Sequence, residues 1–245
     1  MLKKLAGTAL TAAALIAAAA IAPAIAHAAP IAVTPGSEVI VVHSDGTPTV
    51  QRASGVTRHP DNHPASPDGD RCTLGFVFQG SDGEPRALIA AHCGDVHEEI
   101  RTPDGRTIGR IADAAEYSDA PNSPDTALVS FNPGVVVDSR IAGLGPVRGT
   151  ISPEDIKRTN PILCKLGAVT GMSCGPVDFD TPAPDGFLTV HTQRAGGDSG
   201  GPMWTFGEHG EVLAVGTHSG GPGGRMDRSF VESVDTYLRT WDLKV

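Results

Sequence analysis

The sequence predicts an all-β protein made of antiparallel barrels or a sandwich. Short runs rich in β-branched and aromatic residues alternate with turns, for which the 245 residues supply 30 Gly and 20 Pro. A helical spacing of apolar residues is strong only near the C-terminus. Many short strands with almost no helix are typical of antiparallel architectures rather than of alternating strand–helix units.

Residues 1–28 have the layout of a secretory signal peptide. Lys3 and Lys4 precede an apolar, Ala-rich run to Ile25, and Ala26-His27-Ala28 follows as a small-residue cleavage motif. A membrane anchor is the alternative, which the many small alanines disfavour. We therefore expect a secreted, extracellular protein with no stable membrane association after signal removal.

Residues 29–69 are interpreted as an N-terminal arm or short pro-segment. Residues 39–42 are expected to form one strand, whereas 59–64 are too rich in proline for a regular element. His59 and His63 flank Asp61 in that stretch. A solvated loop is favoured there over a metal site, because no further ligands lie nearby in the sequence.

Residues 70–150 are predicted to form a first β unit. A hairpin joins two strands across the turn at residues 81–83, and further strands follow after turn residues. The expected strands are 74–79, 87–91, 107–112, 126–131 and 141–144.

Residues 151–245 repeat this pattern and are predicted to form a second β unit. Ser152-Pro153-Glu154-Asp155 combines an N-cap, a first-turn proline and an acidic first turn, which predicts a brief helix between the two halves. The expected strands are 162–165, 168–172, 187–191, 203–206 and 212–216.

A longer helix is predicted at the C-terminus, capped by Ser229 or Ser233. Its apolar residues recur at three- and four-residue spacing and would pack on the second unit. They are Phe230, Val234, Tyr237, Leu238 and Trp241.

The charge balance excludes some classes of partner. The formal net charge is -9, and the predicted leader removes two lysines and no acidic residue. No basic cluster is present that could displace counterions from phosphates, so we expect no nucleic acid and no anionic membrane as partner. No EF-hand-like spacing occurs, and we expect neither a metal nor another cofactor.

Four cysteines in an exported chain predict two disulfides. Three pairings are possible, and the pairing of nearest neighbours is preferred, Cys72 with Cys93 and Cys164 with Cys174. A zinc site is disfavoured because no C-x-x-C pair occurs.

A candidate nucleophile lies in the Gly-rich stretch Gly197-Asp198-Ser199-Gly200-Gly201-Pro202. A serine hydroxyl needs a base to take its proton, and glycines can aim successive N–H groups at the oxyanion that forms. His92 follows a predicted strand, and Asp125 precedes another. In the order His, Asp, Ser, they supply a base, a group that orients it and a nucleophile.

These segments resemble the signature segments of the chymotrypsin-like serine peptidases. Ala91-His92-Cys93, Asp125-Thr126-Ala127-Leu128 and 197–202 match in content and order. The resemblance is strongest to the secreted actinobacterial streptogrisin and α-lytic type. Arg71-Cys72-Thr73-Leu74-Gly75-Phe76 resembles the start of the mature domain of that type, and the segment from Cys164 to Gly175 resembles its disulfide hairpin.

The resemblance implies two antiparallel Greek-key β-barrels with the active site between them and a C-terminal α-helix. The triad would be His92, Asp125 and Ser199, and the N–H groups of Gly197 and Ser199 would form the oxyanion hole. Ser219, Gly220 and Gly221 would bind an extended substrate as an added strand. The implied function is that of a secreted, monomeric serine endopeptidase acting on protein or peptide substrates.

The chain differs from the family in how the turn at residues 197–202, called the serine turn below, would be supported. The Ile-Val-Gly-Gly N-terminus of the animal enzymes is absent. Lys165, directly after Cys164, is expected to pair with Asp198 and hold the oxyanion turn. The segment before Asp70 is also shorter than the folding pro-regions common in this branch.

The segments expected to line the substrate pocket also differ from those of the family. A cysteine pair that usually braces it is missing, and Gln193, Arg194 and Ala195 stand in that region. His218 is at a position that resembles the specificity histidine of glutamyl endopeptidases, with His191 and Arg194 nearby in sequence. We expect a preference for Glu or Asp before the scissile bond. The alternative is a pocket for small or apolar side chains, with His218 merely lining a wall.

Two other classes remain as alternatives. An α/β-hydrolase is disfavoured because its order is Ser, Asp, His, and only 46 residues follow Ser199. The other alternative is a catalytically silent, secreted binding protein with the chymotrypsin fold. A complete His92, Asp125 and Ser199 set argues against it, because binding alone requires none of these three.

Overall fold

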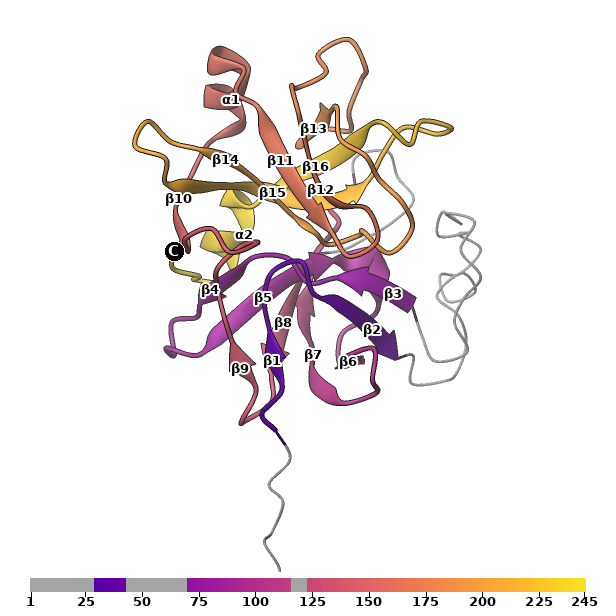
Figure 1. Ribbon diagram of the computed structural model, residues 1–245, viewed down its shortest axis with the longest axis vertical. Helices are drawn as coiled ribbons and strands as arrows, with labels where there is room; N and C mark the ends of the chain where they lie inside the picture. Colours follow the sequence, from indigo (N-terminus) through magenta and orange to yellow (C-terminus); the bar gives the residue numbers. More distant parts are fainter. Residues whose placement is uncertain (1–28, 43–69, 116–122) are drawn as a thin grey trace, which may run out of the picture.

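Two curled, mainly antiparallel sheets lie one above the other in the computed structural model (Figure 1). The structure describes residues 29–42, 70–115 and 123–245. The predicted signal peptide and the loop with His59 and His63 lie outside these residues. None of the helices in the described ranges is long and apolar enough to span a bilayer.

The first sheet has the strand order β3-β2-β6-β7-β8-β5-β4. All of its neighbouring strands are antiparallel. Its strands are β2 (Glu38–Val42), β3 (Asp70–Thr73), β4 (Val77–Gln79), β5 (Pro85–Ala90), β6 (Glu99–Arg101), β7 (Thr107–Ala114) and β8 (Thr126–Phe131).

Strand β2 lies in the segment that the sequence suggested as an arm. It pairs with both β3 and β6, so the first sheet takes in residues well before Asp70. The alternation of EVIVV explains this position, because Val39 and Val41 are fully buried while their neighbours are partly exposed.

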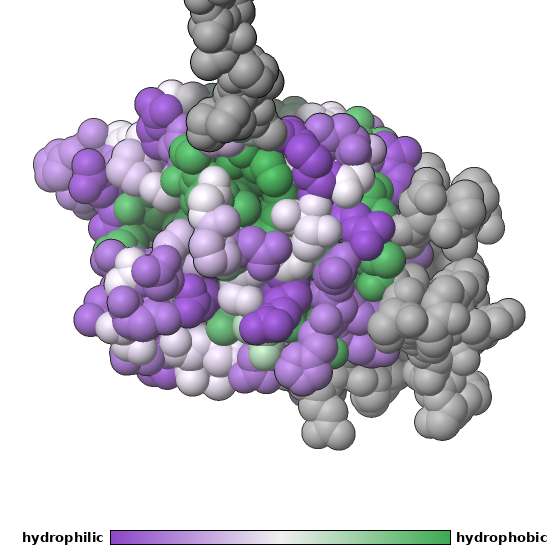
Figure 2. Space-filling model, turned by 90° about the horizontal axis from the view of Figure 1, so that it is seen from below, coloured by the Kyte–Doolittle hydropathy of each residue, from purple (hydrophilic) through white to green (hydrophobic). Residues whose placement is uncertain are grey.

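The short strands β1 (Ala32–Val33) and β9 (Val136–Val137) pair in parallel at the lower end of this barrel (Figure 1). Figure 2 shows the molecule from that end, where hydrophobic surface gathers within a mostly polar face. Val136 of β9 is 51% exposed.

The second sheet has the strand order β12-β11-β14-β15-β16-β13, and β10 pairs in parallel with β15. Its strands are β10 (Val147–Thr150), β11 (Leu163–Gly167), β12 (Gly171–Gly175), β13 (Phe187–Val190), β14 (Pro202–Phe206), β15 (Val212–Gly220) and β16 (Ser229–Ser233). Together with the first sheet, this arrangement confirms the predicted all-β fold with two barrel-like halves.

Most of the predicted strands are present, with shifted ends. The prediction for 126–131 is confirmed without change. The prediction for 141–144 is wrong: Ile141 is fully buried, but its backbone lies in a turn, and β10 begins three residues beyond Leu144. Residues 168–170 form the turn between β11 and β12 rather than the start of a strand.

The helix between the halves is confirmed as α1 (Pro153–Thr159). The Ser152 Oγ accepts a hydrogen bond from the Asp155 N–H at 3.1 Å, as its N-cap position predicts. The C-terminal helix is shorter than predicted, because α2 spans Asp235–Thr240. Ser229 and Phe230 instead lie in β16, which pairs with strands on both sides, and this pairing outweighs the helical spacing. Val234, rather than Ser229 or Ser233, is at the N-cap.

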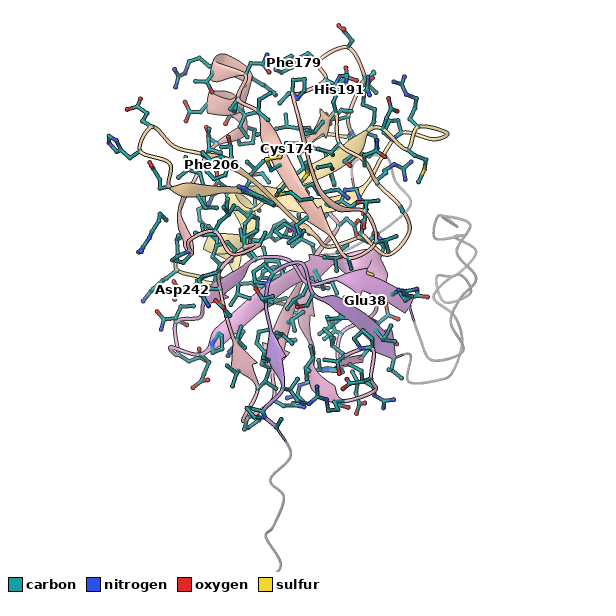
Figure 3. All side chains as sticks on the ribbon, in the orientation of Figure 1. Glu38, Cys174, Phe179, His191, Phe206 and Asp242 are labelled. Carbon is teal, nitrogen blue, oxygen red and sulfur yellow. A yellow bond between two sulfur atoms is a disulfide. The ribbon has the colours of Figure 1, made fainter. Side chains whose placement is uncertain are left out.

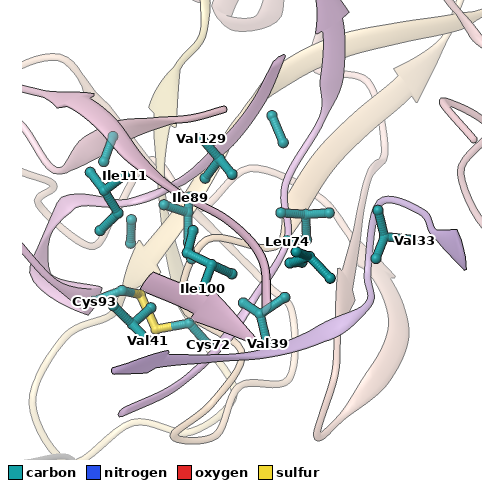
Figure 4. Packing of buried hydrophobic residues seen from close by; sticks show 14 of the residues in the cluster. Val33, Val39, Val41, Cys72, Leu74, Ile89, Cys93, Ile100, Ile111 and Val129 are labelled. Carbon is teal, nitrogen blue, oxygen red and sulfur yellow. A yellow bond between two sulfur atoms is a disulfide. The ribbon is translucent and has the colours of Figure 1, made fainter. Parts of the chain in front are cut away.

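Three apolar clusters fill the part of the molecule that the structure describes. One lies inside the first barrel, where Figure 4 shows Val39, Val41, Ile89, Ile100 and Val129 packed beside the Cys72–Cys93 disulfide. A second combines residues of both halves, among them Phe76 and Leu88 with Trp204. The third lies within the second half. Because one cluster is shared, the two barrels form a single packed body with the serine turn at their junction.

The structure confirms both preferred disulfides. Cys72–Cys93 joins β3 to the 3-10 helix η2 (Ala91–Cys93), with the two Cα atoms 6.3 Å apart. Cys164–Cys174 crosses the β11–β12 hairpin, with a Cα separation of 4.0 Å.

Candidate active site

The predicted base and its orienting carboxylate are in direct contact. His92 lies in η2 directly after β5, and Asp125 immediately precedes β8, which pairs with β5. The His92 Nδ1 lies 2.7 Å from Asp125 Oδ2, and the backbone N–H of His92 donates to Oδ1 at 2.8 Å. Because a carboxylate only accepts, Nδ1 carries the proton, which leaves Nε2 as the basic atom of a neutral ring.

Asp125 is itself held from the second barrel. The Ser219 hydroxyl at the end of β15 donates to Asp125 Oδ2. Glu232 of β16 accepts from the Asp125 N–H at 2.9 Å and from the Thr126 hydroxyl at 2.7 Å. Ser219, predicted to bind substrate, therefore also contacts the orienting carboxylate.

Glu232 is a supporting residue that sequence reasoning missed. It is 7% exposed, and its second carboxylate oxygen accepts from the Tyr237 hydroxyl of α2 at 2.6 Å. Burial raises the pKa of Glu232, although its hydrogen-bond donors partly offset this effect. A charged residue directly after the apolar pair Phe230-Val231 was the available signal.

The serine turn is anchored on β3 of the first barrel. The backbone N–H of Thr73 donates to the Ser199 carbonyl at 2.8 Å, and the Thr73 hydroxyl donates to the Gly197 carbonyl at 2.7 Å. The Cys93 Sγ, one residue from His92, lies 3.9 Å from the same Ser199 carbonyl oxygen. These contacts bring η2 and the serine turn against one strand, with Ser199 itself 6% exposed.

Two glycines of this turn have left-handed backbones that disfavour any side chain. Gly197 has φ +96° and Gly200 has φ +92°. A Cβ at Gly200 would also lie 2.4 Å from the Thr73 carbonyl oxygen. Among the described residues, no backbone carbonyl accepts a hydrogen bond from the N–H of Gly197 or of Ser199. Both donors of the predicted oxyanion hole are therefore not used by the backbone around them.

The predicted ion pair between Lys165 and Asp198 is present beneath the turn. The Lys165 Nζ lies 2.6 Å from Asp198 Oδ2, and both side chains are fully buried. Asp198 also accepts from the Thr170 hydroxyl at 2.6 Å and from the N–H groups of Val169, Thr170 and Ala195. Thr170 is a further supporting residue that sequence reasoning missed.

Burial and charge pairing act in opposite directions on the two groups of this pair. Burial acts to raise the pKa of Asp198, but Lys165 and the other donors outweigh it and hold that pKa below its ordinary value. Burial lowers the pKa of Lys165 in spite of the attraction of Asp198. The fit is tight, since a Cβ on Gly167 would lie 2.2 Å from Asp198 Oδ1.

The predicted substrate edge lies beside the serine turn. The Gly200 N–H donates to the His218 carbonyl at 2.8 Å, and the His218 N–H donates to the Gly201 carbonyl at 2.9 Å. Gly220, at the end of β15, has φ +128° and open space where a Cβ would lie. Gly221 follows it directly.

His218 is more deeply buried than its predicted role suggested. It is 1% exposed, and its Nδ1 lies 3.3 Å from the Phe230 carbonyl oxygen. Burial, with the positive charge of Lys165, lowers the pKa of His218 well below its ordinary value. His191 contacts a different group: its Nε2 lies 3.4 Å from Asp178 Oδ2, and Figure 3 shows it toward the end of the second barrel that is away from the first.

Nothing in the described ranges gathers three or more His, Cys, Asp or Glu side chains that could hold a metal ion. The site brings together a histidine, the carboxylate that contacts it, a glycine turn with a serine, and backbone N–H groups. A set of this composition is suited to acyl transfer.

Comparison with known proteins supports the fold. No protein-family model and no curated protein sequence matches the chain. Among solved structures, Nocardiopsis protease is similar with a TM-score of 0.56 and 24% identity, over 72% of this chain and 94% of that one. Thermobifida fusca protease A has a TM-score of 0.58 and 20% identity, over 87% of this chain and 97% of that one.

A third similar structure is described as a glutamic acid specific serine protease that utilizes a histidine triad in substrate binding. It has a TM-score of 0.57 and 19% identity, over 87% of this chain and all of that one. Each similarity extends over nearly the whole length of the other protein. The chain thus has the fold of the actinobacterial chymotrypsin-like serine proteases.

Proposed function

We propose that the protein is a secreted serine endopeptidase that hydrolyses peptide bonds through His92, Asp125 and Ser199. The observation that carries this proposal is the 2.7 Å contact between His92 Nδ1 and Asp125 Oδ2, beside a glycine turn that presents Ser199. A protein that only binds has no need to fix the tautomer of a histidine in this way.

The chemistry proceeds in two acyl-transfer steps. Ser199 Oγ attacks the carbonyl carbon of the scissile bond while His92 Nε2 takes its proton, and His92 then gives that proton to the leaving amine. Water repeats the sequence on the acyl-enzyme and releases the acid. Asp125 stabilises the imidazolium that forms each time.

The N–H groups of Gly197 and Ser199 stabilise the oxyanion in both steps. Each such donor is worth on the order of 3 kcal/mol in the transition state. The Lys165–Asp198 pair holds the turn that carries them, and Ser219, Gly220 and Gly221 receive the substrate backbone.

We further propose a preference for Glu or Asp before the scissile bond. His218 on β15 and the side chain of Arg194 both lie next to the predicted substrate edge, and a glutamic acid specific protease of similar fold uses histidines in substrate binding. Secretion is proposed from the leader at residues 1–28, and the two disulfides are consistent with an oxidising compartment. On this view, residues 70–150 and 151–245 form the main parts of the two barrels.

The test is digestion of an unbiased peptide library by the secreted protein, with Ser199→Ala as the matched control and cut sites identified by mass spectrometry. We expect cuts only with the unmutated protein, and a rise in rate with pH through neutrality, because a protonated imidazole cannot act as a base. A fluorophosphonate should label the unmutated protein and not Ser199→Ala. No cleavage together with no labelling would favour the catalytically silent binding protein.

A further inference from the structure

Arg194 bridges the two segments that flank the nucleophile. Its backbone N–H donates to the Met226 carbonyl at 2.9 Å. Its side chain points toward the same segment of the chain: Nε donates to the Arg225 carbonyl and Nη2 to the Pro222 carbonyl, both at 3.1 Å. The residue is 7% exposed, so a permanent positive charge is buried between the segment before Ser199 and the segment after β15.

The side chain of Arg194 lies against Gly221, one of the residues predicted to bind the substrate backbone. A Cβ added to Gly221 would lie 2.5 Å from Arg194 Nε and 2.9 Å from its Cδ. On the other side, a short turn links Arg194 to the nucleophile, because the Asp198 N–H donates to the Ala195 carbonyl at 3.1 Å. The guanidinium group therefore lies beside the residues that would hold the substrate backbone, while the backbone of Arg194 leads directly into the turn that carries Ser199.

His218 is unsuited to supply the positive charge at this place. Its Nδ1 faces a carbonyl oxygen, which can only accept, so Nδ1 carries the proton of the ring. Burial, Lys165 and Arg194 all act against a second proton on the ring, and only Asp198 and the Phe230 carbonyl favour one. A neutral ring with its proton on Nδ1 presents a lone pair at Nε2, which does not attract a carboxylate.

We propose that Arg194, rather than His218, determines specificity by pairing with the carboxylate of a Glu or Asp that precedes the scissile bond. A carboxylate entering a buried site needs a cation with matching donors, and a guanidinium group supplies both. Arginine also keeps its charge when buried, whereas a histidine gives up its proton. This inference rests on the proposed peptidase function, and it names the residue that recognises the substrate side chain before the scissile bond.

The test compares kcat/KM for four peptides that differ only before the scissile bond, with Glu, Asp, Gln or Ala there. The unmutated protein should cleave after Glu about 10- to 100-fold faster than after Gln, as expected for a charged hydrogen-bonded pair. Arg194→Gln should bring the two rates within about threefold, while Arg194→Lys should keep part of the preference because it keeps the charge. Arg158→Gln, on the exposed face of α1, removes an equal charge and should leave the preference intact.

Several outcomes would overturn the inference. Equal cleavage after Glu and Gln by the unmutated protein does so without any variant, and so does a full preference in Arg194→Gln. A further peptide with Leu before the scissile bond adds one more such outcome: if Arg194→Gln cleaves it and the unmutated protein neither cleaves it nor prefers Glu, the arginine only fills the pocket. Fluorophosphonate labelling distinguishes failure of this inference from failure of the proposed function. A protein that is labelled but shows no acidic preference contradicts only the role of Arg194. A protein that is neither labelled nor active contradicts the proposed peptidase function.

Discussion

The two barrels hold their catalytic candidates by different physical means. In the first barrel, the buried charged residues in the described ranges are Glu98 and Asp125. In the second, four buried charged or titratable side chains lie in or beside the serine turn, namely Lys165, Arg194, Asp198 and His218. Two more are buried elsewhere in this half: Asp178 pairs with Arg228, and Glu232 holds Asp125. The nucleophile thus rests on buried charges of its own barrel, whereas the base lies on an apolar barrel and Asp125 receives its charged support from the second one.

Because of this difference, the two barrels contribute to the stability of the site in different ways. Hydrophobic burial stabilises without regard to pH or to the choice of partner. A buried charge stabilises only while its partner is present and ionised. We therefore expect the second barrel to decide how the site responds to acid and to single charge changes, and the first barrel to decide whether the base is competent.

The largest effect should come from the first barrel. Asp125→Asn should lower kcat by about 10⁴-fold, because the amide no longer selects the tautomer with the proton on Nδ1. Steady-state kinetics measure this, with Asp82→Asn in the exposed hairpin turn as the control. A loss below about tenfold would mean that Asp125 does not orient His92.

The second-largest effect is expected at the buried Lys165–Asp198 pair of the second barrel. Lys165→Met should lower the free energy of unfolding by about 3–5 kcal/mol, because it leaves the Asp198 carboxylate buried without its cation. Urea unfolding measures the change. Arg86→Met breaks an exposed pair with Asp82 in the first barrel and should cost far less. Equal losses in the two variants would remove the contrast between the barrels.

A third prediction concerns acid. The folded pKa of His218 is lowered, so below about pH 6.5 the unfolded chain takes up a proton that the folded protein does not. Stability from this group is present above that pH and falls as pH falls, by at most about 1.4 kcal/mol per pH unit. Lys165, Arg194 and Asp198 are the charges that act on it.

Unfolding measured between about pH 5 and 7 should show this dependence. His218→Asn should reduce the slope, while His209→Asn, at an exposed position, should leave it unchanged. An unchanged slope in His218→Asn would place the acid sensitivity elsewhere.

The smallest difference compares the two disulfides. Cys72–Cys93 spans 21 positions and Cys164–Cys174 spans 10. Chain entropy predicts losses of about 3.4 and about 2.8 kcal/mol when each pair is replaced by serine, a difference of about 0.6 kcal/mol. Only the first replacement should also lower kcat, because Cys93 neighbours His92 in η2. A larger loss of activity on removal of Cys164–Cys174 would contradict this assignment.

Local patterns were sufficient for much of the fold. Turn residues and period-two runs located most strands, including 126–131 without error, and the capping pattern at Ser152 located α1. They failed where a distant partner decided the outcome. Phe230 fits a helix by its spacing, but β13 and β15 on either side draw it into β16. The strand expected at 39–42 is present as β2, but it was assigned to an arm, because its partners β3 and β6 cannot be inferred from its own residues.

By itself, the sequence determined the order of His92, Asp125 and Ser199, the glycines that the serine turn requires, and a preferred pairing of four cysteines. These follow from residue type and short spacing. Only the tertiary structure decided which groups support them, since Thr73 and Gly197 lie 124 positions apart and yet share a hydrogen bond. It also decided that His218 and Arg194 are both buried, and that burial lowers the pKa of His218 well below its ordinary value. Desolvation and charge coupling depend on what surrounds a group in three dimensions, and no local pattern records that.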